Sequence, residues 1–270
     1  GWDFDAFYRQ LKDVGVEVAP CLQGCAPYLV GFDKERTDEK PVAGQDPAEP
    51  RSYIAHASYL FQFAARYGGT PCDATLLKLK PGQPVKSGLN LVRYIENWNE
   101  PDKWWKDRAS HFQPFELAAM CSADYDGHKG SLGPGVGVKN ADPNMKLVLG
   151  GLARPEIEYL KAMKLWAEFH REGDFPAGVV AVVVQVDHVG GEVGNPTTGI
   201  SPEADGLRER FERVVRWRDR FLPGKEVWVS EFGYDANPKS NQRAPAIGQA
   251  SAEEVQGQWI VRSYLALAAS

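Results

Sequence analysis

The sequence has 270 residues, of which 43% are hydrophobic and 25% are charged, and its formal net charge is −5. The length and composition are ordinary for one large globular domain, and the small negative charge with scattered basic residues excludes an electrostatic case for binding nucleic acid or an anionic membrane. No apolar run is long enough to span a bilayer, so no membrane span is expected.

Helices alternate with strands in the first half of the chain. The hydrophobic spacing predicts an amphipathic helix over residues 5–14 and a strand over residues 16–22. A second helix is predicted over 52–67, where two glycines end it, and a second strand over 91–96. The next helix is expected over 114–121 and somewhat beyond.

The second half of the chain repeats this alternation. A glycine-rich stretch, residues 127–137, precedes a predicted strand over 146–150 and a predicted helix over 156–172. The continuous apolar run over 178–186 is typical of a strand that is buried on both faces. A further helix is predicted over 202–221.

The last predicted strand covers residues 225–230, and the last predicted helix covers 252–269. One helix comes first, and five strands follow, each with a helix after it. This alternation indicates an α/β fold with a parallel sheet and right-handed crossovers. No second pattern and no linker interrupts the alternation. Residues 1–270 are therefore expected to form a single domain.

The second predicted strand runs into the segment IENWNEP, in which Glu100 stands near the strand end. Asn99 places an amide beside this carboxylate, where it can hydrogen-bond a sugar hydroxyl. Trp98 can pack beneath and is a candidate substrate-binding residue. Taken alone, the Glu-Pro pair would be a turn that caps the next helix. Glu96 is expected to support the site or to join a buried ion pair rather than to catalyse.

A second segment of the same kind, VWVSEFG, places Glu231 at the tip of the last predicted strand. Trp228, Phe232 and Tyr234 flank it with aromatic rings, which can stack on sugars, and Tyr234 is a candidate substrate-binding residue. A carboxylate in aromatic surroundings is costly to bury unless it is paired or used. A salt-bridged structural glutamate is the alternative interpretation.

Two glutamates at strand tips are what glycoside hydrolysis needs. One carboxyl group must protonate the leaving oxygen, and the other must attack or support the anomeric carbon. Barrel enzymes place their chemistry at the C-terminal ends of strands. Glu100 and Glu231 are far apart in the sequence, so only the fold can bring them together.

Other polar residues are considered for the same cleft or for a metal. Asp187 and His188 follow the apolar run of the fourth predicted strand, and His188 is a candidate substrate-binding residue, with a structural or solvated histidine as the alternative. Asp124, Asp126 and His128 resemble a fragment of a calcium loop but lack its later bidentate glutamate, so no metal is expected. Phosphate-loop and Gly-x-Ser-x-Gly motifs are absent from the sequence, and no cofactor is expected.

The four cysteines do not determine a redox state. Cys21 and Cys25 lie at a strand end and in its loop, where a disulfide and free thiols both fit, and Cys72 and Cys121 have no zinc-site spacing. The chain opens on Gly1 without a visible signal peptide, and such a start indicates trimming. The compartment and the oligomeric state are left open, with a secreted or periplasmic location as the working expectation.

Together the two motifs resemble those of glycoside hydrolase clan A, the retaining (β/α)8-barrel glycosidases. That clan has Asn-Glu-Pro at the end of barrel strand 4, matched by Asn99-Glu100-Pro101, and a nucleophilic glutamate at the end of strand 7, matched by Glu231 in SEFG. The resemblance implies that Glu100 is the acid/base, Glu231 the nucleophile and Asn99 the hydroxyl-binding amide. The wider sequence is similar to bacterial proteins related to glycoside hydrolase family 39.

The sequence departs from the clan pattern in two ways. Clan members usually carry a His or Tyr at the end of strand 6 that contacts the nucleophile, and here His188 can stand in. With Glu100 ending strand 4 and Glu231 ending strand 7, the chain would cover about strand 3 to helix 7. We therefore expect an incomplete (β/α)8 TIM barrel, truncated at both ends, whose open sheet edges would favour aggregation.

The leading functional hypothesis is a retaining O-glycosidase that hydrolyses an oligo- or polysaccharide by a two-glutamate double displacement. The alternative is a non-catalytic carbohydrate-binding pseudoenzyme or an inactive fragment of a glycosidase. A third class, barrel lyases or isomerases, would need a metal cluster or a lysine base, and neither is well placed. The sugar, the linkage and the choice between exo and endo action do not follow from the sequence.

Overall fold

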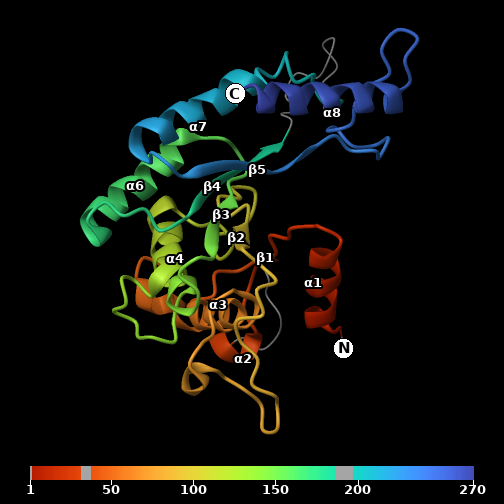
Figure 1. The fold of residues 1–270 in the computed structure, drawn as a ribbon. Helices are drawn as coiled ribbons and strands as arrows, with labels where there is room; N and C mark the ends of the chain where they lie inside the picture. Colours follow the sequence, from red (N-terminus) through yellow and green to blue (C-terminus); the bar gives the residue numbers. More distant parts are fainter. Residues whose placement is uncertain (1, 32–37, 186–196) are drawn as a thin grey trace. The chain divides into compact units, whose positions relative to one another are not determined.

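The computed structural model describes residues 2–31, 38–185 and 197–270. Within them the chain forms two compact units, which are described separately (Figure 1). The N-terminal unit consists of Gly1–Gly151 and Glu158–Val180, and the C-terminal unit of Leu152–Ile157 and Ala181–Ser270.

Strands that run parallel form the centre of the fold. Their order in the sheet is the same as their order in the chain, β1-β2-β3-β4-β5. In the described part of the chain the strands are β1 (Cys21–Leu22), β2 (Tyr94–Asn99), β3 (Lys146–Gly151), β4 (Val179–Gln185) and β5 (Glu226–Gly233). The pairs β1–β2, β2–β3 and β3–β4 are parallel, with Ile95 opposite Leu147 and Val148 opposite Val179. The predicted α/β class with a parallel sheet is therefore confirmed.

Helices connect successive strands, as the alternation predicts. The longer helices are α1 (Phe4–Asp13), α3 (Ile54–Tyr67), α4 (Pro114–Asp126), α6 (Ile157–Arg171), α7 (Leu207–Phe221) and α8 (Ala252–Ala268). Short helical turns are α2 (Pro27–Val30), α5 (Val138–Ala141) and the 3-10 turns Pro50–Tyr53 and Ala74–Leu76. Side chains cap the N-termini of several helices. At α8, Ser251 and Glu254 form a reciprocal capping box, which satisfies two otherwise unpaired backbone amides.

Two strands differ from their predicted positions because backbone groups find other partners. The first strand is short because Val16 N–H donates back to Leu11 O at 2.9 Å, and Pro20 offers only its carbonyl, which accepts from Glu96 N–H at 3.0 Å. The second strand begins at Tyr94 rather than at residue 91, since Leu91 and Val92 donate to Tyr67 O at the end of α3. β2 also ends later than predicted, at Asn99, so Glu100 follows the strand directly.

The helix predicted over 202–221 begins only at Leu207. Residues 202–206 form a wider turn, in which Leu207 N–H donates to Pro202 O at 3.0 Å. Gly206 adopts a left-handed φ of 63°, which glycine reaches without steric cost and which separates the turn from the helix.

The N-terminal unit has a core between β2, β3 and α3, which packs beside α4 (Figure 1). Ile95 and Leu147 meet Leu60, Phe61 and Ala64 there, all without exposed surface. The described interior of β4 is buried throughout, from Val179 to Val183, as its apolar run predicts. Burial of this kind contributes roughly 1.5–3 kcal/mol for each large apolar side chain.

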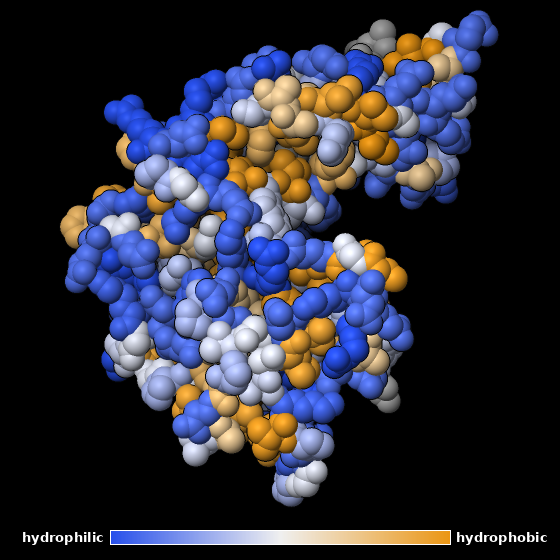
Figure 2. All heavy atoms as spheres, in the orientation of Figure 1, coloured by the Kyte–Doolittle hydropathy of each residue, from blue (hydrophilic) through white to orange (hydrophobic). Residues whose placement is uncertain are grey.

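The C-terminal unit has a smaller core, in which Tyr234, Ala244, Val255 and Trp259 pack together. Four other large apolar residues of α8 are exposed, and Figure 2 shows apolar surface over this part of the unit. They are Ile260, Val261, Tyr264 and Leu265. Among the helices of the described residues, none is both long enough and apolar enough to cross a membrane.

Candidate functional site

The Asn-Glu-Pro segment forms a strained turn at the end of β2. Asn99 is the last residue of the strand and pairs with Gly151 of β3. Trp98 and Glu100 have φ angles of 84° and 45°, in the left-handed region that residues with a side chain seldom adopt. Such residues cost roughly 1–3 kcal/mol each and are found where a site demands a particular geometry. Five other described residues with a side chain also have a positive φ, among them Asn90 and His128, but none of the five directly follows a strand.

Backbone hydrogen bonds hold Glu100 in place. Its N–H donates to Gly151 O at 3.1 Å, and its carbonyl accepts from Lys103 N–H at 3.2 Å. Gly151 N–H in turn donates to Glu96 Oε1 at 3.2 Å. One glycine of β3 thus binds both glutamates of the motif, which gives Glu96 the supporting position that the sequence predicts for it. Glu100 is half-buried.

A fully buried polar cluster lies behind the motif. Asn97 Nδ2 donates to Asp124 Oδ2 at 2.9 Å, and His56 Nδ1 lies 3.0 Å from Asp124 Oδ1. None of the three side chains has exposed surface. Because the carboxylate accepts from Asn97 and from the imidazole, the cluster links β2 to α4 and α3. Sequence reasoning missed this cluster, and the one signal for it is that Asn97 alternates with Asn99 on the same strand.

The Trp98 ring lies in the interior of the N-terminal unit. It has no exposed surface and meets His56 and Phe112 edge-on, with ring centroids 5.7 and 5.4 Å away. This is the supporting position beneath the strand end that the sequence suggests. A direct contact of Trp98 with substrate stays a prediction.

The second motif lies in the C-terminal unit, on β5. Glu231 stands two residues before the end of this strand and is exposed, as is Ser230. Trp228 is half-buried, and its Nε1–H donates to Glu226 Oε2 at 3.1 Å. Glu231 is thus exposed in the carboxyl-terminal part of a strand.

Tyr234 follows β5 and turns into the core of the C-terminal unit. Its side chain is buried, and its hydroxyl donates to Ile200 O at 3.1 Å. Burial raises the pKa of this phenol well above its usual range. The ring also packs against Trp259, with centroids 5.1 Å apart. A contact with substrate stays a prediction for Tyr234, and the packing shows that it supports the chain after Glu231.

His188 and its neighbour Asp187 lie outside the described residues. Of the remaining candidates, Asn99, Glu100 and Trp98 belong to one continuous turn of the N-terminal unit. Glu231 and Tyr234 belong to the C-terminal unit. Trp98, Asn99 and Glu100 therefore lie together in one unit, and Glu231 and Tyr234 lie together in the other.

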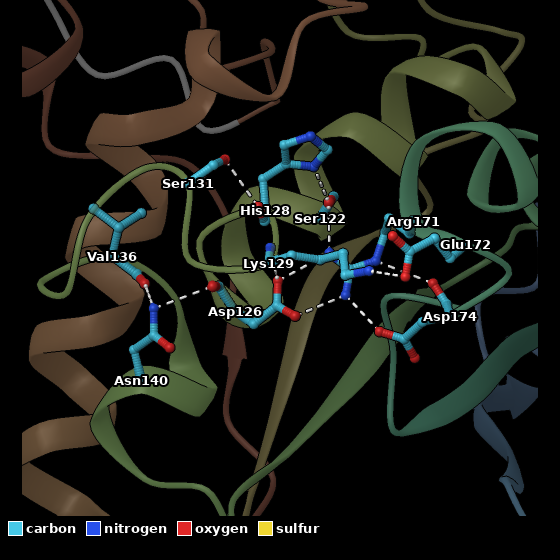
Figure 3. A network of polar contacts seen from close by, with 10 residues as sticks. All are labelled: Ser122, Asp126, His128, Lys129, Ser131, Val136, Asn140, Arg171, Glu172 and Asp174. Carbon is cyan, nitrogen blue, oxygen red and sulfur yellow. Dashed lines mark hydrogen bonds and ion pairs between the residues drawn. The ribbon is translucent and has the colours of Figure 1, made fainter.

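Asp124, Asp126 and His128 each have a hydrogen-bond partner within the protein. Asp126 receives two hydrogen bonds from the buried Arg171, at 2.9 and 2.7 Å, and Arg171 also donates to Asp174 (Figure 3). His128 Nδ1 lies 2.8 Å from Ser122 Oγ. Across residues 2–31, 38–185 and 197–270, no group of three or more metal-binding side chains occurs.

All four cysteines are free thiols in this structure. Burial raises the pKa of Cys25 to about 11, so this thiol stays protonated and unreactive at neutral pH. The disulfide between Cys21 and Cys25 that the sequence left open is not formed.

Comparison with known proteins identifies similar folds but no sequence relatives. No protein-family model matches the sequence, and no curated protein matches it. A solved glucosidase from Croceicoccus marinus has a TM-score of 0.51 and 13% identity, over 88% of this chain and 39% of that chain. A family 51 alpha-L-arabinofuranosidase from Bifidobacterium longum has a TM-score of 0.52 and 14% identity, over 98% of this chain and 47% of that chain.

The chain spans less than half the length of either of these structures. At such low identity the likeness establishes the fold, which is that of a (β/α)8 barrel. The described residues supply five parallel strands in chain order, where a closed barrel of this type has eight. The predicted incomplete TIM barrel is thereby confirmed.

Proposed function

We propose that this protein is a retaining O-glycosidase of clan A type, in which Glu100 is the general acid/base and Glu231 the nucleophile. The observation that carries the proposal is the turn at the end of β2, where Glu100 has a left-handed φ and is bound through its N–H to Gly151. Strain at an Asn-Glu-Pro strand end is expected where a carboxyl group must be aimed.

The fold supports this assignment. Glu100 directly follows β2, and Glu231 lies near the end of β5. Carboxyl-terminal strand ends are where barrel enzymes keep their active residues. The two solved structures with similar folds are described as a glucosidase and an arabinofuranosidase, both of which act on glycosides. In the assembled site of a retaining enzyme, the two carboxyl groups should lie about 5–5.5 Å apart.

The chemistry follows from two carboxyl groups in different protonation states. Glu100, protonated, donates its proton to the glycosidic oxygen while Glu231, ionised, attacks the anomeric carbon; the leaving sugar departs as an alcohol. Glu100, now ionised, then takes a proton from water, whose oxygen attacks the same carbon and releases Glu231 as a carboxylate. Each glutamate ends as it began, and one water molecule is consumed.

Neighbouring residues take the supporting roles. Asn99, half-buried beside Glu100, would hydrogen-bond a hydroxyl of the sugar that is attacked. Trp98 and Tyr234 would support the residues that bind the substrate, because both rings are buried. His188 would contact the nucleophile or substrate, and residues 1–270 would form one catalytic domain. The mechanism needs no cofactor, and the substrate would be an oligo- or polysaccharide.

A covalent trap tests the proposal. The protein is first assayed on a panel of aryl glycosides and polysaccharides. The sugar that is cleaved is then supplied as a 2-deoxy-2-fluoro glycoside with an activated leaving group, which slows release of the covalent intermediate. Peptide mass spectrometry should find the fluorosugar on Glu231. Labelling of another carboxylate, or hydrolysis with inversion at the anomeric carbon, would overturn the assignment. Binding of polysaccharide without hydrolysis would favour the carbohydrate-binding pseudoenzyme.

A further inference from the structure

Two successive side chains of β2 contact the same pair of helix residues. Ile95 packs in the core against α3, and Asn97, on the same face of the strand, donates to Asp124 of α4. Side chains along a strand alternate between its two faces, so the next residue, Trp98, would be expected on the opposite face. Its ring instead meets His56 of α3 edge-on, with centroids 5.7 Å apart. The hydrogen-bonded pair of His56 and Asp124 thus contacts both neighbours.

The backbone of Trp98 breaks the alternation. Its φ is 84°, whereas residues of a regular strand have negative φ angles. Among the described residues that carry a side chain, no other residue inside a strand has a positive φ. A bulky residue in this region persists only where the surrounding structure holds it. The contacts of Asn97 and of the Trp98 ring are therefore the ones that hold the backbone before Glu100.

The residues that make these contacts are fully buried and fix one another. His56 Nδ1 lies 3.0 and 3.1 Å from the two carboxylate oxygens of Asp124, and Asn97 Nδ2 donates to the second of them at 2.9 Å. The Trp98 ring also meets Phe112 edge-on, with centroids 5.4 Å apart. None of these five side chains has exposed surface. Asp124 thus limits the orientation of the imidazole and of the amide, and the imidazole limits that of the indole.

We infer that His56 and Asp124 are positioning residues for Glu100. They hold the Asn97 amide and the Trp98 ring, maintain the left-handed backbone at Trp98, and so set the direction in which the chain leaves β2. The inference rests on the proposed function, because it is the proton donor that has to be aimed. Without this pair, Trp98 would relax to a negative φ, and Glu100 would turn away from the glycosidic oxygen.

This role determines which step suffers when the pair is disturbed. A misplaced Glu100 donates its proton poorly, so glycosylation slows most for a leaving group that needs protonation. An activated aryl leaving group departs with little such help. A displacement of about 1 Å can cost on the order of 100-fold in rate. Residues that only stabilise the fold would instead change the amount of folded protein, and the rates on both substrates would fall by the same factor.

The test compares His56→Asn and Asn97→Leu with the control Tyr8→Leu. Asparagine has an amide nitrogen near the position of the imidazole Nδ1, so His56→Asn keeps the donated hydrogen bond and removes the ring that meets Trp98. Asn97→Leu keeps the volume of the side chain and removes its amide. Tyr8 is also buried, and it packs at the other end of α3, against Tyr67, with ring centroids 5.0 Å apart. Its replacement disturbs the same helix far from His56.

One measurement is the dependence of the rate on the leaving group. We determine kcat/KM, which reports the glycosylation step, on phenyl and dinitrophenyl glycosides of the sugar that the wild type cleaves. His56→Asn and Asn97→Leu should each lose about 10- to 100-fold on the phenyl glycoside and less than about threefold on the dinitrophenyl glycoside. Tyr8→Leu should lose the same factor on both.

The other measurement needs no substrate. Hydrogen exchange resolved to single amides follows the Glu100 N–H, which donates to Gly151 O at 3.1 Å. In His56→Asn and in Asn97→Leu this amide should exchange about tenfold faster, or more, relative to the amides of β3. In Tyr8→Leu the ratio should equal that of the wild type. If one of the two variants does not fold, the other decides by the same measurements.

The outcomes separate this inference from the proposed function. Hydrolysis by the wild type, with equal losses on both glycosides in His56→Asn and Asn97→Leu, would overturn the positioning role and leave the glycosidase standing. Unchanged exchange of the Glu100 amide in both variants would also overturn it. A wild type that hydrolyses no glycoside would overturn the glycosidase. Faster exchange in both variants would then still support the hold of the pair on the turn.

Discussion

His56 and Asp124 form a hydrogen-bonded pair inside the N-terminal unit, with 3.0 Å between Nδ1 and Oδ1 and no exposed surface on either side chain. The same carboxylate accepts from Asn97, which lies two residues before Asn99 on β2. The pair therefore connects the cores of α3 and α4 to the strand that ends in Glu100. With Asp124 as the acceptor from both neighbours, the Nδ1 atom of His56 carries the hydrogen.

Removing the shared acceptor should destabilise the fold. Asp124→Ala leaves the His56 Nδ1–H and the Asn97 amide without a partner in a place that water does not reach. Each buried donor left unpaired costs roughly 1–3 kcal/mol, so the free energy of unfolding should fall by about 3 kcal/mol. Urea unfolding at neutral pH measures this loss. Asp73→Ala is the control, because Asp73 is exposed and accepts from Thr75 in a surface turn. Equal midpoints for the two variants would contradict the prediction.

The close approach of β3 to the turn at the end of β2 can be tested with one methyl group. A Cβ on Gly150 would lie 2.5 Å from Asn97 O and 2.6 Å from Trp98 O, closer than real Cβ atoms come to backbone. Gly150→Ala should therefore push β2 away, lower the unfolding free energy by roughly 1–3 kcal/mol and reduce activity. Thermal unfolding and the aryl glycoside assay measure both effects. Gly135→Ala meets nothing within 4 Å and should change neither; a similar loss in both variants would refute the steric explanation.

The two glutamates proposed to be catalytic should give different phenotypes. Glu231→Ala cannot form a glycosyl-enzyme, so all substrates should lose activity by several orders of magnitude. Glu100→Ala should still be glycosylated by a substrate with an activated aryl leaving group, but its deglycosylation should be slow. For a β-linked substrate, added azide should rescue Glu100→Ala and give the β-glycosyl azide, and should rescue Glu231→Ala and give the α-azide. NMR of the products distinguishes the two.

Glu96→Gln is the matched control for this pair. Its amide oxygen can still accept from Gly151 N–H, as Glu96 Oε1 does. The variant should retain activity within about tenfold of the wild type, since its role is to position the turn. Wild-type turnover in both alanine variants would end the catalytic assignment, and a loss in Glu96→Gln as large as in Glu100→Ala would point to Glu96 as the acid/base.

The contribution of Asp5 to stability should depend on pH. Burial alone would raise the pKa of Asp5, but hydrogen bonds from Arg66 and Lys86 outweigh it and hold the pKa at about 2, below its usual 3.8. The unfolded chain thus binds the proton more readily, so the stabilisation is complete above about pH 4 and disappears as the pH falls through 2. Because both cations are partly exposed, we expect about 1–2 kcal/mol at pH 7.

Urea unfolding of wild type and Asp5→Asn between pH 2.5 and pH 7 measures this pH dependence. The difference in unfolding free energy between the wild type and Asp5→Asn should become smaller as the pH falls. In an Arg66→Met background the gap at pH 7 should be smaller, since Arg66 makes two hydrogen bonds to Asp5 at 2.8 Å each. A gap that stays constant over this range would show that the ion pairs do not cause it.

Local patterns in the sequence were sufficient to predict the strongest elements. The apolar run predicted over 178–186 is β4, Val179–Gln185, and the periodic segment at 156–172 is α6, Ile157–Arg171. These elements agree because burial on both faces, or on one helical face, is written directly in the spacing of apolar residues. The start of β2 differed because Leu91 and Val92 bond to Tyr67, a partner that no local pattern reveals.

The sequence by itself determined the chain order of strands and helices and the position of Glu100 and Asn99 at a strand end. Only the tertiary structure decided that Trp98 and Tyr234 turn inward, that Glu96 binds Gly151, and that Trp104 and Trp105 stay at the surface. It also decided that Asp124 pairs with His56 and Asn97. The physical reason is that alternation and periodicity are local properties of the backbone, whereas burial and hydrogen-bond partners depend on residues that the fold brings together from distant parts of the chain.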